Sequence, residues 1–84
     1  QLIRTKMKAV VYSRDNCQWC ERVKQLFNAT NISITEYKFG EHFDRKAFYQ
    51  EFGEGATFPQ VQIDNIPIGG CKETLQYLQK KKLI

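Results

Sequence analysis

The sequence predicts an α/β fold whose strands and helices follow the order β-α-β-α-β-β-α. Short runs rich in β-branched and aromatic residues indicate strands, and stretches with apolar residues at helical spacing separate them. The chain has 84 residues, of which 42% are hydrophobic, so one domain with a modest core is expected. Met7 stands directly before the first strand-like run. We therefore expect one domain over residues 7–84, with residues 1–6 as a non-native remnant or an N-terminal extension.

The first half of the chain predicts a strand, a helix and a second strand. "KAVVY" (8–12) is a short apolar run typical of a buried strand. A helix pattern begins at Cys17, and Asn16 is a candidate N-cap. Its apolar positions at helical spacing are Trp19, Val23, Leu26 and Phe27. "SITEYKFG" (33–40) predicts the next strand, and a β-α-β unit of this length implies parallel pairing with a right-handed crossover.

A second helix is predicted after Asp44, which suits an N-cap. Phe43 and Phe48 stand at the two positions of a hydrophobic staple around that cap. We expect the helix to run to about Phe52, because Gly53 suits the position that follows a helix.

The last third of the chain predicts a β-hairpin and a closing helix. "FPQVQID" (58–64) indicates a strand opened by Pro59, where proline costs no ladder hydrogen bond. "DN" then forms a turn into "IPI", which gives the hairpin. After "GG" a final helix is expected, with Leu75 and Leu78 on its buried side.

Charge and cysteine content limit the classes of partner. The net charge of +4 favours mild attraction to anionic ligands, and the lysines at 80–82 suit the end of a helix dipole better than a nucleic-acid site. We therefore expect no nucleic-acid partner. No run approaches the roughly 20 apolar residues that span a membrane, so no membrane association is expected. The odd count of cysteines argues against a secreted disulfide framework and favours a reducing, cytoplasmic location.

"RDNCQWC" (14–20) contains a C-x-x-C pair at the junction of a strand and a helix. The first backbone N–H groups of a helix have no internal partner, so they stabilise a thiolate at Cys17. Arg14 adds positive charge nearby, and we expect the thiol pKa of Cys17 to fall below about 8.5. Cys20 lies one turn further along, which suits a resolving thiol.

Two other uses of this pair are weaker. Zinc needs about four ligands, and the spacing of Cys17, Cys20, Cys71 and His42 matches no common zinc pattern, so no metal site is expected. A structural disulfide between Cys17 and Cys20 would close a very short loop and stabilise the fold little.

"TFPQV" and "IGGC" supply two further elements. A cis bond before Pro59 would turn the backbone of Phe58 outward to pair with an extended peptide, whereas a trans bond would make it an ordinary strand start. The two glycines either place helix N–H groups against a carboxylate or form a tight strand-to-helix turn. Cys71 either lies beside the ligand or is a packed, redox-neutral residue, and we favour packing.

Together, C-x-x-C before a helix, T-x-P-Q-V and I-G-G-C resemble the glutaredoxins over nearly the whole chain from about Met7. The resemblance implies the dithiol type and a thioredoxin-like fold, with a four-stranded mixed sheet flanked by three helices. The short length is also compatible with a small virus-encoded member. The resemblance implies that Cys17 is the nucleophile and Cys20 the resolving thiol. It further implies a glutathione site formed by Arg14, Trp19, Thr57, Phe58, Pro59, Gly70, Cys71 and Lys72.

The chain departs from the usual glutaredoxin pattern at several of these positions. Gln18 stands where a proline is common, Phe58 replaces a smaller valine, and Lys72 stands where an aspartate often meets the glutathione amino group. Glu73 is a candidate to compensate for Lys72, and "EGA" (54–56) precedes the threonine where a basic residue is often found.

The resemblance implies a glutathione-dependent thiol–disulfide oxidoreductase that reduces protein disulfides or glutathione mixed disulfides. Glutathione would be the reductant, with no tightly bound cofactor. Partners would be disulfide-containing or glutathionylated proteins, with ribonucleotide reductase as one family-level candidate, and the protein would be a monomer. The alternative is a dimer that binds a [2Fe–2S] cluster through Cys17 and glutathione.

Overall fold

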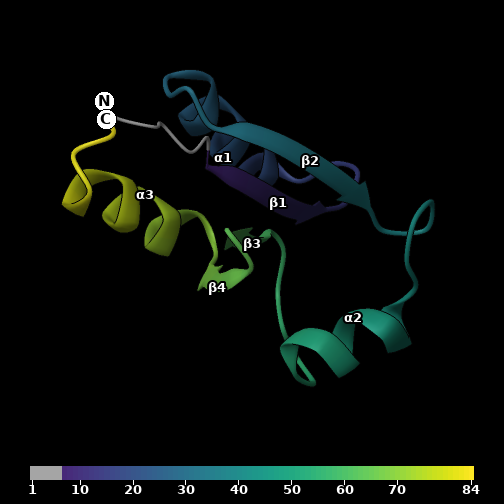
Figure 1. Ribbon diagram of the computed structural model, residues 1–84. Coiled ribbons are helices and arrows are strands. Elements are labelled where there is room, and N and C mark those ends of the chain that lie inside the picture. Colours follow the sequence, from purple (N-terminus) through teal and green to yellow (C-terminus); the bar gives the residue numbers. More distant parts are fainter. Residues whose placement is uncertain (1–6) are drawn as a thin grey trace.

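The computed structural model of the protein describes residues 7–84, so the expectation for residues 1–6 lies outside the described part. The order of elements is the predicted one (Figure 1). The strands are β1 (Lys8–Ser13), β2 (Ser33–Lys38), β3 (Gln60–Ile63) and β4 (Ile66–Gly69), and the helices are α1 (Gln18–Asn28), α2 (Arg45–Phe52) and α3 (Cys71–Lys80). Within the described range, every helix is too short or too polar to cross a membrane.

The four strands form one mixed sheet in the order β2-β1-β3-β4. β1 pairs with β2 in parallel, as the predicted β-α-β unit requires, and β3 pairs antiparallel with both β1 and β4. The hairpin turn has positive φ at both Asp64 (51°) and Asn65 (67°), as in a type I′ turn. The mixed sheet with three helices confirms the predicted thioredoxin-like fold.

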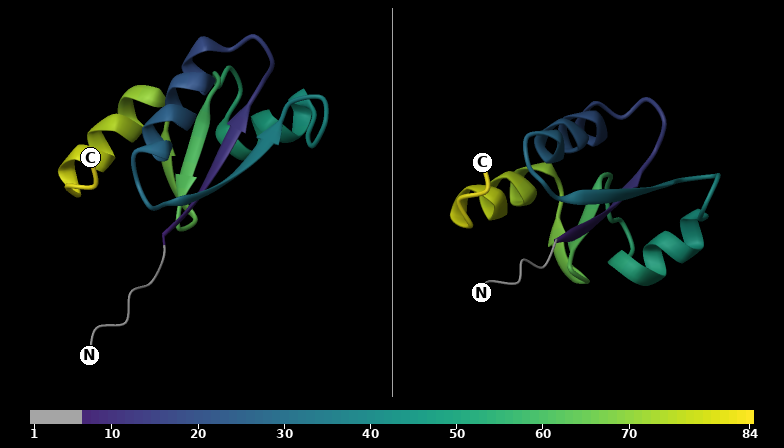
Figure 2. Two further views of the ribbon diagram at one scale, coloured as in Figure 1. Left: turned by 90° about the horizontal axis from the view of Figure 1, so that it is seen from above. Right: turned by 45° about the horizontal axis from the view of Figure 1, so that its top comes forward.

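The helices divide between the two faces of the sheet. α1 and α3 contact each other and cover one face, whereas α2 lies on the other side (Figures 1 and 2). The core between α1, α3 and the sheet is mostly aliphatic. Its buried members are Ala9, Val11, Val23, Phe27, Val61, Ile63 and Leu78. We call this the aliphatic side of the sheet.

The side of the sheet that α2 covers is aromatic. Phe48 is the buried residue of α2, and its ring stacks on Phe43 at 5.6 Å and on Phe58 at 4.2 Å between centroids. The first contact is the predicted hydrophobic staple. The side chain of Asp44 accepts from the N–H of Ala47 (2.9 Å), which confirms the predicted cap. We call this the aromatic side of the sheet.

The start and orientation of α1 differ from the prediction. Cys17 is the N-cap, and the expectation that Asn16 caps the helix is wrong, since Asn16 has φ of 55° in the turn before it. Trp19 is 55% exposed, although we expected it on the apolar stripe. The buried stripe runs through Cys20, Val23 and Phe27, whereas Trp19, in the first turn of the helix, lines a surface cavity instead.

Other boundaries shift by one or two residues. β2 ends at Lys38 rather than at residue 40, and β3 begins at Gln60 rather than at 58. In α3 the buried residues are Thr74 and Leu78, whereas Leu75 is half-buried rather than buried. The hydroxyl of Thr74 donates to the carbonyl of Gly70 (2.8 Å), which lets a polar side chain take the inner position.

Candidate active site

Cys17 and Cys20 form a disulfide at the N-terminus of α1, with their Cα atoms 5.2 Å apart. The helix positions both sulfurs, since Cys17 caps it and Cys20 lies in its first turn. The backbone N–H of Cys20 donates to Sγ of Cys17 (3.1 Å). A hydrogen-bond donor and the positive end of the helix dipole both favour negative charge on that sulfur once the disulfide is reduced.

The two cysteines differ in their access to solvent. Cys17 retains 7% of its surface, whereas Cys20 is fully buried. An external disulfide therefore meets Cys17 first, and Cys20 is reached only from Cys17. This burial suits the role of resolving thiol that the sequence predicts for Cys20.

The loop before Cys17 is held by charged side chains. The guanidinium of Arg14 donates to the carbonyl oxygens of Asp15 (3.1 Å) and Asn16 (3.3 Å). Asp15 also pairs with Lys38 on β2 (2.8 Å), and the hydrogen bond and charge of Lys38 lower the pKa of the Asp15 carboxyl. Arg14 thus holds the backbone of residues 15 and 16, which leads directly to Cys17. It also places a positive charge near Cys17.

A polar network lies where β1, β2 and α1 meet, close to the cysteines. The hydroxyl of Ser13 donates to Glu36 (2.6 Å), and Nζ of Lys24 lies 3.1 Å from the same carboxylate oxygen. Burial opposes ionisation of Glu36, but the hydrogen bonds from Ser13 and Lys24 outweigh it and lower its pKa. Lys24 also pairs with Glu21 (2.8 Å), so the network connects α1 to β1 and to the edge strand β2.

A groove beside the disulfide gathers the residues expected to bind glutathione. Thr57 and Phe58 line two adjoining cavities, of about 270 and 340 Å³. The smaller cavity contains Trp19, Thr57, Phe58, Pro59, Gly70, Cys71 and Lys72, and the larger contains Arg14 with Phe39, Arg45 and Tyr49. The structure therefore brings seven of the eight predicted binding residues to one cavity and places Arg14 in the adjoining one. The bond between Phe58 and Pro59 is cis, which is the first of the two forms considered from the sequence.

The N-terminus of α3 already has an acidic partner. The carboxylate of Glu73 accepts from the N–H of Gly70 (3.0 Å). Gly69 has φ of 123°, and a Cβ there would lie 3.0 Å from the Glu73 side chain. The glycine pair therefore forms the tight turn, which is the second of the two alternatives, and the Glu73 carboxylate occupies part of the position that a ligand carboxylate would take in the first.

Arg22 and Arg45 are two residues near the groove that the sequence reasoning did not select. The guanidinium of Arg22 lies 5.4 Å from the ring of Trp19, one turn further along α1. The i, i+3 spacing of Trp19 and Arg22 was the available signal for this contact. For Arg45, which comes from α2, the sequence carried no such signal, because only the tertiary fold brings α2 to the groove.

Cys71 is half-buried, is outside the disulfide and packs against the aliphatic core. Burial is the main cause that raises the pKa of its thiol, the charge of Glu73 adds to the rise, and that of Arg22 opposes it. The thiol therefore stays protonated at neutral pH, which agrees with the packing interpretation. Among residues 7–84, no three His, Cys, Asp or Glu side chains are grouped as metal ligands.

Comparison with known proteins identifies the family. The glutaredoxin family model matches residues 9–68. Glutaredoxin 1 of Rickettsia typhi is 28% identical over 76 residues, which cover 88% of this chain and 73% of the relative.

Solved structures agree with that match. Glutaredoxin 1 of Francisella tularensis, crystallised with cacodylate, is 33% identical and has a TM-score of 0.75, covering 92% of this chain and 96% of that one. A buckwheat glutaredoxin–glutathione complex is 29% identical with a TM-score of 0.63, covering 89% of this chain and 71% of that one.

Proposed function

This chain belongs to the glutaredoxin family of thiol–disulfide oxidoreductases, and we propose that it reduces disulfides between glutathione and protein thiols, with glutathione as the reductant. One observation carries the proposal. Cys17, the more exposed cysteine of the pair, caps α1, whose Trp19 lines a groove together with the 57–59 segment, while Cys20 is fully buried.

The reaction begins when the Cys17 thiolate attacks the glutathione sulfur of a mixed disulfide. A new disulfide joins Cys17 to glutathione, and the protein thiolate of the substrate leaves and takes up a proton. A second glutathione thiolate then attacks the glutathione sulfur, which releases oxidised glutathione and restores Cys17.

Cys20 provides a second route. Its thiolate attacks Sγ of Cys17, expels glutathione and forms the Cys17–Cys20 disulfide that the structure contains. Two glutathione molecules in turn reduce this disulfide and leave as oxidised glutathione. The same dithiol exchange lets the protein reduce a disulfide within a protein substrate.

The charges around the groove match the groups of glutathione. Glutathione is an extended tripeptide with two carboxylates and one ammonium, and the groove offers exposed cations at Arg14 and Lys72. The backbone of Phe58 is suited to pair with the cysteinyl part in the manner of strand addition. Glu73 lines the same cavity as Lys72 and would supply a carboxylate for the glutathione ammonium group. The buckwheat complex, in which a related protein binds glutathione, supports this assignment.

The proposal is tested by glutathione-coupled reduction of a mixed disulfide between glutathione and a peptide thiol. We expect the wild type to turn over, Cys17→Ser to lose activity to background, and Cys20→Ser to keep activity on this substrate. Cys71→Ser tests the third thiol, and we expect its turnover to survive with at most a change in KM, because Cys71 lines the groove but is not the nucleophile. Turnover that survives in Cys17→Ser, or that does not require glutathione, would contradict the proposal.

The cluster-binding alternative remains a prediction with its own readout. A dimer holding a [2Fe–2S] cluster through Cys17 would absorb visible light after anaerobic purification and would lose that absorption in Cys17→Ser. A colourless protein that turns over mixed disulfides is the outcome that our proposal expects.

A further inference from the structure

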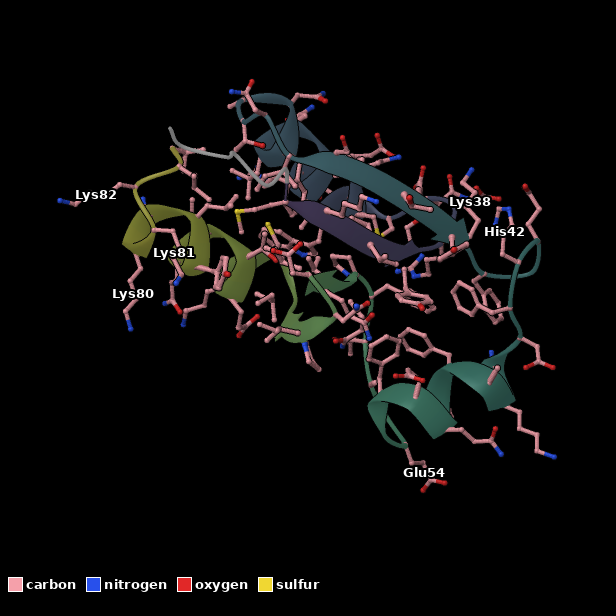
Figure 3. The ribbon with its side chains drawn as sticks, viewed as in Figure 1. Lys38, His42, Glu54, Lys80, Lys81 and Lys82 are labelled. Atoms are coloured by element: carbon pink, nitrogen blue, oxygen red, sulfur yellow. A yellow bond between two sulfur atoms is a disulfide. The ribbon has the colours of Figure 1, made fainter. Side chains whose placement is uncertain are left out.

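A further cavity, of about 340 Å³, lies on the aromatic side of the sheet, and none of the eight residues expected to bind glutathione lines it. Its volume falls at the lower end of the roughly 300–1,000 Å³ range of small-molecule sites. Five rings and one carboxylate form most of its wall, namely Tyr12, Tyr37, Phe43, Phe48, Phe52 and Glu51. Figure 3 shows ring-bearing side chains lying between the sheet and α2. We call this the aromatic cavity.

The rings of the aromatic cavity meet around Tyr12. Its centroid lies 4.9 Å from that of Phe52 and 5.5 Å from that of Phe43, both at near-perpendicular angles. Tyr37 lies 5.5 Å away on the neighbouring strand, opposite Tyr12 in the sheet register. Rings that meet edge to face turn their faces in different directions, so they form a curved wall. Each face carries the negative end of a quadrupole.

The aromatic cavity has an acidic residue in its wall and no lysine or arginine among the described residues. Glu51 is its acidic residue, and within the described residues no lysine or arginine lines it, although the chain has 13 of them. His42 lines the cavity with Nδ1 accepting from the N–H of Lys38 (2.9 Å). Burial, followed by the charge of Glu51, raises the pKa of Tyr12, so its phenol stays neutral. The electrostatic preference of the cavity is therefore for a cation.

We propose that the aromatic cavity binds a small organic cation that carries a methylated ammonium group. Such a group is attracted to aromatic faces within about 6 Å and is weakly enough hydrated to leave water for an apolar wall. Glu51 supplies the opposite charge. A hard metal ion is a poorer fit because one carboxylate gives too few oxygen ligands, and a neutral aromatic ligand would make no use of Glu51.

Binding is measured by NMR titration of the isotope-labelled full chain with choline. The neutral control is the alcohol in which carbon replaces the choline nitrogen, since it has the same shape without the charge. We expect choline to shift amide signals of β1, the 39–44 loop and α2, and to bind at least about fivefold more tightly than the alcohol. Equal affinity for both compounds, or shifts confined to the cysteine groove, would overturn the proposal.

Two variants locate the site. Glu51→Gln keeps the shape of the side chain and should weaken choline binding about fivefold, and Tyr37→Leu should weaken it about two- to fivefold by removing one π face. Glu54→Gln is the matched control, because Glu54 lies beyond the end of α2 and outside the cavity (Figure 3), and it should bind as the wild type does. Choline binding that Glu51→Gln leaves unchanged would contradict the proposal.

The cation has two chemical sources, a free small molecule or a trimethylated lysine side chain. A parallel titration with acetylated trimethyllysine amide separates them. Tighter binding of choline assigns the cavity to the free cation, and tighter binding of trimethyllysine assigns it to a modified polypeptide. If neither cation binds more tightly than the neutral alcohol, the proposal is overturned. The readout does not depend on thiol exchange, so this result and that of the proposed function are independent.

Discussion

The two sides of the sheet are packed by different kinds of side chain, aliphatic on one side and aromatic on the other. On the aliphatic side, α1 and α3 bury side chains such as Val23, Phe27 and Leu78 to 2% exposure or less. On the aromatic side, α2 has Phe48 as its buried residue, and it meets the sheet through rings with an open cavity between them. The two views of Figure 2 show the sheet between these layers. The closed core therefore lies on one side of the sheet, and the aromatic cavity lies on the other.

The active site lies where the two sides meet. The cysteine pair belongs to α1 and is held by the aliphatic core, since Cys20 occupies the same buried stripe as Val23. Phe58, one residue before Pro59, stacks instead on Phe48 of the aromatic side. We infer that the reacting sulfur is positioned rigidly, whereas the wall of the substrate groove depends on the looser layer of rings.

The largest expected difference between the two sides is in stability. Phe27→Ala should lower the free energy of unfolding by about 3–5 kcal/mol, because it leaves a cavity in a closed core. Phe52→Ala on the half-buried aromatic side should cost about 1 kcal/mol, since that ring already borders open space. Urea denaturation followed by circular dichroism measures both. Equal losses of unfolding free energy in Phe27→Ala and Phe52→Ala would show that the two sides of the sheet contribute equally to stability, which would contradict this prediction.

Phe48→Leu tests the connection between the aromatic side and the groove. Losing the stack on Phe58 should cost about 1–2 kcal/mol of stability and should raise KM for a glutathione mixed disulfide while leaving kcat nearly unchanged. Steady-state kinetics with the purified variant measures this split. A fall in kcat at constant KM would instead place Phe48 in the chemical step.

The polar network under α1 gives the aliphatic side a pH dependence. The pKa of Glu36 is lower in the folded chain than in the unfolded chain. Ionised Glu36 therefore stabilises the fold at pH values above its pKa in the unfolded chain. This stabilisation is lost as the pH falls through its pKa in the folded chain. Glu36→Gln should cost about 1 kcal/mol at pH 7 and should flatten the loss of stability below about pH 4.5. Denaturation midpoints across this range measure the effect. A parallel pH profile in variant and wild type would contradict this role for Glu36.

Trp19→Ala should have the smallest effect on stability. The ring is 55% exposed, so we expect a change within about 0.5 kcal/mol. Its expected effect is on binding, because the ring lines the groove beside Cys71 and Lys72. KM for a glutathione mixed disulfide should rise about two- to fivefold, with Gln18→Ala as a neighbouring control. An unchanged KM would remove Trp19 from the predicted site.

The sequence predicted the order of elements because local signals agreed with the fold. Asp44, the phenylalanine staple and Gly53 each have a local physical reason, and the structure has all three in place. The start of α1 was misplaced because Asn16 and Cys17 both suit a position outside the helix. Asn16 tolerates the left-handed region, which left the capping position to the cysteine.

Contacts between distant segments were harder to predict. The groove residues come from separate parts of the chain, and the family resemblance, not periodicity, selected them. The aromatic cavity was not predicted, since nothing in the spacing of Tyr12, Tyr37 and Glu51 shows that three elements bring them together. The tail lysines 80–82 lie at the end of α3, far from His42 in Figure 3, in agreement with their assignment to a helix end.

We propose that Cys17, and not Cys71, is the sulfur that exchanges with glutathione. The most direct test treats Cys20→Ser with oxidised glutathione and locates the adduct by intact mass and peptide mapping. We expect one glutathionyl group on Cys17 and none on Cys71, because Cys17 caps the helix beside the groove and burial keeps the Cys71 thiol protonated. An adduct on Cys71 with Cys17 unmodified would contradict this claim.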